Sequence, residues 1–220
     1  MPEFGRLEAI DQRDRLHAMP SLIATRTKMF WITGPVLNQG SYPHCVGYAW
    51  KQFLQTTPRR TLVGPNGTDI YREAQYIDEW PGESYDGTSV RAGAKVLNNR
   101  SYLSEYVWGY SVDVIRDFVL MRGPAVLGSA WHQGMMNPDV NGWVYPVGPI
   151  MGGHAYVACG YSAVRNAFRC INSWGLQWGQ KGKFWLHRDD LQVLLNSGGE
   201  ACSAIEKKSA LPSFSNVNAG

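Results

Sequence analysis

The sequence predicts an α+β fold in which a helical half comes first and a sheet-forming half follows. In the first half, apolar side chains recur at three- and four-residue steps, which is typical of amphipathic helices. After Gly123-Pro124 the pattern changes to short apolar runs separated by turns, which is typical of strands. Segregated helices and strands indicate an α+β architecture. A length of 220 residues suits one domain, or two half-domains that share a cleft.

Four helices are expected in the first half, each marked by apolar spacing and by a capping or breaking residue. Two have expected ranges of about 45–55 and 68–78. The other two begin at Ser89 and Ser111, and the last is closed by Gly123-Pro124. The helical lobe is therefore expected over about 38–123.

Short strands are expected in the second half, between turn-forming residues. Their ranges are 125–130, 156–161, 167–173 and 183–186, and an edge strand is expected near 30–32. A β lobe is therefore expected over about 124–207, and residues 1–207 are expected to form a single domain. The polar residues 208–220 show no period and are expected to form a flexible tail.

Composition and charge exclude several classes of protein. Apolar residues make up 44% of the chain, as in ordinary globular proteins, and the net charge is +3 with only short Lys/Arg pairs. We therefore expect no nucleic-acid partner. No apolar run approaches the ~18 residues of a membrane span, and the first residues lack the apolar core of a signal peptide. We expect no membrane association and a cytoplasmic location, with all four cysteines as reduced thiols.

The stretch from Gln39 to Trp50 contains the most reactive candidate group. Cys45 follows a polar, glycine-containing turn and opens the first expected helix. A thiol at a helix N-terminus feels the positive end of the helix dipole, which favours the thiolate. Gln39 lies six residues upstream, with an amide able to point back at the same place. The alternative is that Cys45 is a small buried hydrophobic residue, which is the common role of a free cysteine.

Two further motifs follow in the second half. Gly153-His154-Ala155 enters the apolar run HAYVACGY, and Ile171-Asn172-Ser173-Trp174-Gly175 is followed by Trp178-Gly179. The ordered set Gln, Cys, His and Asn-Ser-Trp-Gly resembles that of papain-like cysteine peptidases, over roughly residues 11–207. His154 alone could be a core histidine, and His44, adjacent to Cys45, is a rival base expected at the cleft rim.

The resemblance implies a papain-like two-lobed fold, with an N-terminal helical lobe, a C-terminal antiparallel β-sheet or barrel lobe, and the active site in the cleft between them. It implies a hydrolase, a thiol protease, in which Cys45 and His154 form a thiolate–imidazolium pair oriented by Asn172. Gln39 and the Cys45 backbone N–H would form the oxyanion hole. No cofactor and no metal are implied. We expect a polypeptide substrate and a monomer.

The resemblance also suggests which residues border the substrate. These are Asp86, Gly87, Gly128, Gly152, Gly153, Ala155 and Trp174. In papain-like enzymes the main selectivity pocket receives the second side chain before the scissile bond. The expected walls of this pocket are Gly128, Gly152, Gly153 and Ala155. Because these four residues are small and uncharged, the pocket is predicted to favour Phe or Leu over Arg.

Other functions remain open from the residues alone. One is a phage or bacterial cell-wall amidase or endopeptidase of the wider Cys-His class. Another is a non-catalytic binding protein on the same fold. Only 38 residues precede Gln39, fewer than a family pro-segment plus the usual lead, so we expect a chain that is active without processing.

Overall fold

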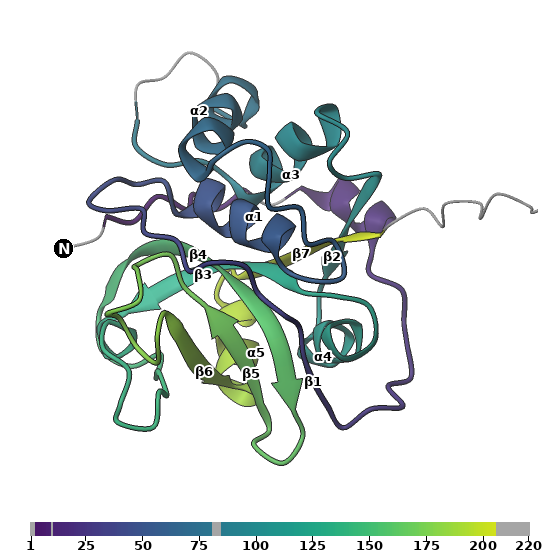
Figure 1. The fold of residues 1–220 in the computed structure, drawn as a ribbon, viewed down its shortest axis with the longest axis vertical. Coiled ribbons are helices and arrows are strands. Elements are labelled where there is room, and N and C mark those ends of the chain that lie inside the picture. The colour runs from purple at the N-terminus through teal and green to yellow at the C-terminus, as the bar shows by residue number, and fades with distance from the viewer. Residues whose placement is uncertain (1–2, 10, 81–84, 206–220) are drawn as a thin grey trace, which may run out of the picture.

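The α+β expectation is confirmed by the arrangement of helices and strands. A computed structural model describes residues 3–9, 11–80 and 85–205, and places three helices over one face of an antiparallel sheet (Figure 1). The helical layer consists of α1 (Cys45–Gln55), α2 (Gly67–Ile77) and α3 (Val90–Asn99). The expected tail at 208–220 lies outside the described residues.

Most helices of the described residues begin after a residue whose side chain accepts a hydrogen bond from a backbone N–H of the first turn, whereas α1 has no side-chain cap. The Asn66 side chain accepts a hydrogen bond from the Asp69 N–H, and Asp69 bonds back to the Asn66 N–H, so α2 begins with a capping box. Ser89 accepts from the Ala92 N–H at the start of α3. Ser111 caps α4 (Val112–Met121) in the same way. The expected helices are thus confirmed to within one or two residues.

In the described residues, seven antiparallel strands form one sheet with the order β2-β7-β3-β4-β5-β6, and β1 also pairs with β4. Their bounds are β1 (Lys28–Phe30), β2 (Glu105–Gly109), β3 (Ala125–His132), β4 (Ile150–Ser162), β5 (Ala167–Ile171), β6 (Lys183–His187) and β7 (Glu200–Ile205). The remaining elements are η1 (Gln12–His17), η2 (Gln133–Met135) and α5 (Arg188–Asn196). Strands β2 and β7 were not expected from the sequence.

The sheet separates two apolar clusters because side chains alternate along its strands. In β4, Ala155 and Val157 pack with Trp50 of α1 on the helical face. Tyr156 and Ala158, one residue out of phase, pack in the other cluster. Strand β4 is central and longer than expected, so His154 lies within a paired strand and not in front of one.

Helix α4 lies in the range expected for the helical lobe, yet it packs on the opposite face of the sheet. Its apolar residues Ile115 and Phe118 belong to the cluster that contains Leu127 and Tyr156. It contacts β4, β1 and α5, and Figure 1 shows it on the side of the sheet away from α1. No helix in the described ranges is long and apolar enough to cross a membrane.

The N-terminal residues pass along the boundary between the helical layer and the sheet (Figure 1). The Arg6 N–H donates to the Gly153 carbonyl of β4 at 2.9 Å, and the Thr88 N–H donates to the Gly5 carbonyl at 2.9 Å. The chain thus uses its own first residues to bridge the two layers, at the place where the candidate catalytic residues lie.

Candidate active site

Cys45 is the first residue of α1 and its side chain is fully buried. Burial raises the pKa of this thiol to about 11, and hydrogen bonds from the backbones of Ala155, Gly5 and Val46 oppose only part of that effect. The thiol is therefore neutral at pH 7 in this arrangement. This differs from the expected thiolate, because a helix terminus contributes only about 0.3–1 kcal/mol, less than the cost of desolvating the charge.

His154 comes from β4 and is also fully buried. Its Nε2 lies 2.8 Å from the Asn172 Oδ1, and its Nδ1 has no hydrogen-bond partner among the described residues. The Ser173 N–H also donates to the Asn172 Oδ1 at 2.8 Å, which fixes the orientation of the amide. Nε2 therefore carries the proton, and the Nδ1 lone pair is free. Burial lowers the pKa of His154 to about 4, although the hydrogen bond to Asn172 acts to raise it.

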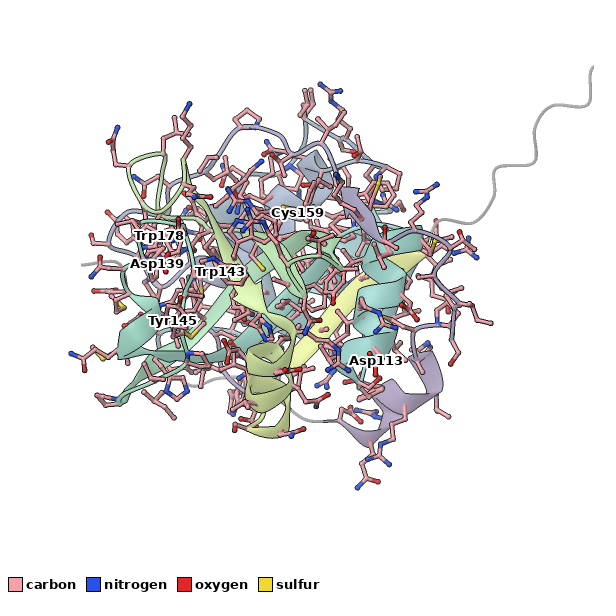
Figure 2. All side chains as sticks on the ribbon, turned by 90° about the horizontal axis from the view of Figure 1, so that it is seen from below. Asp113, Asp139, Trp143, Tyr145, Cys159 and Trp178 are labelled. Atoms are coloured by element: carbon pink, nitrogen blue, oxygen red, sulfur yellow. The ribbon has the colours of Figure 1, made fainter. Side chains whose placement is uncertain are left out.

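Aromatic rings enclose the imidazole. The Trp174 and Trp131 ring centroids lie 4.7 and 4.8 Å from that of His154. Trp178 lies further out: its Nε1 donates to the Met136 carbonyl at 2.7 Å, and it contacts Trp174. In Figure 2, Trp178 lies on the same side of the molecule as Asp139 and Trp143. These contacts bury the imidazole, and Trp178 packs against Trp174 on the outer side.

Gln39 lies just before the turn that leads into α1, and its amide is fixed from both ends. The Ser173 Oγ donates to its Oε1 at 2.7 Å. Its Nε2 then donates to the carbonyl oxygens of Tyr42, at 2.7 Å, and of Glu3, at 3.0 Å. A donor expected to bind a substrate oxyanion is therefore bound to a carbonyl of the chain's own N-terminus.

Residues 3–8, hereafter the covering segment, lie over these groups. Phe4 places its ring edge-on to His154 and Trp174, with centroid separations of 5.9 and 6.1 Å. Gly5 packs so closely that a Cβ there would lie 1.8 Å from the Pro43 carbonyl oxygen. This cover contributes to the burial of Cys45 and His154, together with the aromatic rings around the imidazole, and burial is the main cause of both pKa shifts.

The expected substrate-binding residues surround the covering segment. A Cβ on Gly152 would lie 2.6 Å from the Phe4 Cβ, and one on Gly153 would lie 2.0 Å from the Arg6 carbonyl oxygen. Gly87, Gly128 and Trp174 contact the segment. Asp86 lines a cavity together with it, and Ala155 lies beside Cys45. The segment thus occupies the place expected for a peptide substrate.

One important pair was missed by the sequence analysis. The Arg6 guanidinium bonds to the Glu200 carboxylate beside Gly128. The expectation that no acidic residue stands at this pocket is therefore wrong. Arg6 and Glu200 are 194 residues apart, and neither belongs to a motif, so no local signal could have paired them.

The other candidate residues lie elsewhere. His44 stacks against Tyr71, at a centroid separation of 4.2 Å, and its Nδ1 lies 3.3 Å from the Thr68 Oγ1, so it faces α2. All four cysteines are unpaired, as expected. In the described part of the chain, no group of three or more His, Cys, Asp or Glu side chains could hold a metal ion.

The arrangement of the elements is that of the papain-like cysteine protease fold. The chain is similar to xylellain, a cysteine protease from Xylella fastidiosa, with a TM-score of 0.72 and 18% identity, over 92% of this chain and 96% of that one. It is similar to procathepsin L2 from the larval midgut of Tenebrio molitor, with a TM-score of 0.59 and 17% identity, over 90% and 73%.

A third similar structure is the Carica candamarcensis cysteine protease CMS1MS2 in complex with E-64, with a TM-score of 0.60 and 15% identity, over 84% and 100%. No family model and no curated protein matches the sequence. The likeness therefore lies in the fold, which is similar at low sequence identity.

Proposed function

We propose that this chain is a cysteine endopeptidase whose nucleophile is Cys45. The observation that carries the proposal is the buried bond between His154 Nε2 and Asn172 Oδ1, which leaves Nδ1 without a partner among the described residues, on a strand that packs against the helix beginning at Cys45. In the same fold, the similar structures are described as cysteine proteases. Residues 1–207 would form one catalytic domain.

The chemistry follows from the protonation states. His154 Nδ1 takes the proton from the Cys45 thiol, and the thiolate attacks the carbonyl carbon of a peptide bond. The oxyanion that forms is stabilised by the Gln39 side-chain N–H and the Cys45 backbone N–H. The imidazolium then protonates the leaving amine, and water, deprotonated by the same histidine, hydrolyses the thioester. Asn172 orients the ring throughout.

The covering segment makes this arrangement a resting state. Gln39 Nε2 is bound to the Glu3 carbonyl, and Cys45 and His154 are both neutral because they are buried. When the segment leaves, water reaches both groups, and their pKa values move back toward each other, which favours the ion pair. The four unpaired thiols suit the reducing conditions of the cytoplasm, where we propose that the protein acts as a monomer.

The test is turnover of a fluorogenic dipeptide panel in reducing buffer by the chain, by Cys45→Ala and by Cys159→Ala. Cys159 is also buried, but it lies five residues after His154 on β4 and its Sγ donates to the Arg169 carbonyl. We expect Cys45→Ala to abolish turnover and Cys159→Ala to retain it. Turnover that survives in Cys45→Ala would refute the assignment.

A further inference from the structure

The side chain of Arg6 leaves the covering segment and enters a pocket beside the candidate active site. Its Nε donates to the Glu200 Oε1 at 2.9 Å, and its Nη2 lies 2.8 Å from the same oxygen. Nη2 also donates to the Gly198 carbonyl at 2.7 Å. The side chains of Arg6 and Glu200 are only 5% and 13% exposed. Two nitrogens of the Arg6 guanidinium are thus bound at once, and a guanidinium is suited to this because its donors form a rigid, planar group.

The pocket opens next to the catalytic candidates because of the sheet register. Gly128 of β3 pairs with Ala155 of β4 on one side and with Glu200 of β7 on the other. Ala155 follows His154 directly, and its backbone hydrogen-bonds toward Cys45. A Cβ at Gly128 would lie 2.9 Å from the Glu200 Oε1 and 3.0 Å from the Arg6 Nε. The absence of that Cβ therefore provides the space in which the guanidinium reaches the carboxylate.

Glu200 depends on the N-terminal segment for its partner. Within residues 3–9, 11–80 and 85–205, Arg6 is the only residue that forms a hydrogen bond or an ion pair with the Glu200 side chain. Burial raises the pKa of Glu200 to about 7, although Arg6 acts in the opposite direction. A buried carboxylate without a cation is costly. If the covering segment leaves, the pocket therefore favours another cation that can reach it.

We propose that Glu200 is a specificity-determining residue that binds an arginine side chain of peptide substrates, and that Arg6 is the resting occupant of this subsite. The inference rests on the proposed peptidase function, and it names the substrate class of that same site. It replaces the expectation of a pocket that favours Phe or Leu, which was made without Glu200.

The pocket chemistry ranks the side chains that could enter. Arginine can repeat the contacts of Arg6 to the Glu200 carboxylate and the Gly198 carbonyl. Lysine carries a single ammonium on a flexible stem and cannot present the same fixed set of donors. Leucine would fill the space but leave the carboxylate buried without a partner. The expected order is therefore arginine, then lysine, then leucine.

The experiment compares two fluorogenic peptides that differ only at the second residue before the scissile bond, which is Arg in one and Leu in the other. The ratio of their kcat/KM values is measured for the chain, for Glu200→Gln and for Glu73→Gln. The ratio is the suitable quantity because the fraction of molecules uncovered at any moment affects both peptides equally and cancels. Glu73 is a matched control, since it pairs with Arg100 on the surface.

We expect the chain to prefer the Arg peptide by at least about 10-fold, as charge-assisted hydrogen bonds in a buried site imply. Glu200→Gln should reduce this ratio by about 10- to 100-fold, and Glu73→Gln should leave it unchanged. A chain that prefers Leu, or a ratio that is the same in Glu200→Gln, would overturn the proposal. Thermal melts of each variant show whether it is folded.

A second measurement needs no turnover. An acetylated and amidated peptide of residues 3–8 is tested for its ability to protect Cys45 from iodoacetamide in the Arg6→Ala variant, against the same peptide with Leu in place of Arg. We expect protection by the Arg peptide at about 10-fold lower concentration, and loss of that difference when Glu200→Gln is added. Equal protection by both peptides would contradict the subsite.

The two measurements separate the two proposals. If no peptide is cleaved by the chain or by Arg6→Ala, but the Arg peptide protects Cys45 through Glu200, the peptidase function fails and the arginine pocket stands. If both peptides are cleaved with a ratio that Glu200→Gln does not change, the pocket fails and the peptidase function stands.

Discussion

Removing the Arg6 side chain should uncover Cys45. In the structure the thiol is fully buried beneath the covering segment, so a reagent reaches it only in molecules whose segment has moved away. Arg6→Ala deletes the contacts to Glu200 and Gly198 and retains the backbone bond from the residue 6 N–H to the Gly153 carbonyl. The variant therefore weakens the attachment of the segment without removing it.

The magnitude follows from the bonds that are lost. Hydrogen bonds to charged groups contribute about 1.5–3 kcal/mol to stability. The larger cost of about 3–5 kcal/mol for breaking a buried ion pair does not apply in full, because Glu200 can take up a proton once Arg6 is gone. A net loss of about 2 kcal/mol corresponds to an uncovered fraction about 30 times larger.

The assay is the rate of alkylation by iodoacetamide at pH 7, followed by mass spectrometry of each cysteine-containing peptide. We expect Cys45 in Arg6→Ala to react about 30-fold faster than in the unchanged chain. Cys159, Cys170 and Cys202 are buried in the strands and serve as internal references. They should react at unchanged rates, because their exposure requires the sheet to open.

Arg13→Ala is the matched control, since Arg13 pairs with Asp11 in the same part of the chain but is 84% exposed. It should leave the Cys45 rate unchanged. Adding Glu200→Gln to Arg6→Ala should accelerate the reaction little further, because both changes remove the same contact. A Cys45 rate within twofold of the unchanged chain, or a common rise for all four cysteines, would refute the reasoning.

Three other outcomes can be measured. Burial raises the pKa of Glu200 to about 7, and the charged groups that influence it are Arg6, Arg91 and Asp14. The preference for Arg over Leu peptides should therefore increase from pH 5.5 to pH 8, as Glu200 loses its proton. In Glu200→Gln this preference should not change with pH. The pKa of His154 is lowered from 6.5 to about 4, so its contribution to stability is present above pH 6.5 and is lost as the pH falls toward 4. In urea unfolding, the change in stability between pH 6.5 and pH 4 should differ by about 3 kcal/mol between the unchanged chain and His154→Phe, with the larger loss in the unchanged chain, and His17→Phe should behave as the unchanged chain. Gly47→Ala would place a Cβ 2.0 Å from the Gly67 carbonyl oxygen, where α1 meets α2. Although alanine has the better helix propensity, this variant should destabilise the fold by about 1–3 kcal/mol. A stabilised variant would contradict this.

Local patterns were sufficient to locate the helices and the candidate catalytic residues. The first turn of a helix leaves N–H groups without a partner in the helix, so the capping residues Ser89 and Ser111 mark helix starts wherever the rest of the chain lies. Cys45, His154 and Asn172 stand in long motifs with fixed spacing. Strands β2 and β7 were missed because pairing with a distant strand, rather than local alternation, makes them strands.

The sequence by itself determined the α+β class, the helix starts and the set of candidate catalytic residues, because these depend on neighbours a few positions away. Only the tertiary structure decided what covers the site and what charge its residues carry. The ion pair between Arg6 and Glu200 joins the two ends of the described chain. The pKa values of Cys45 and His154 depend on exclusion of water, which is a property of the packed fold, and no residue spacing records it.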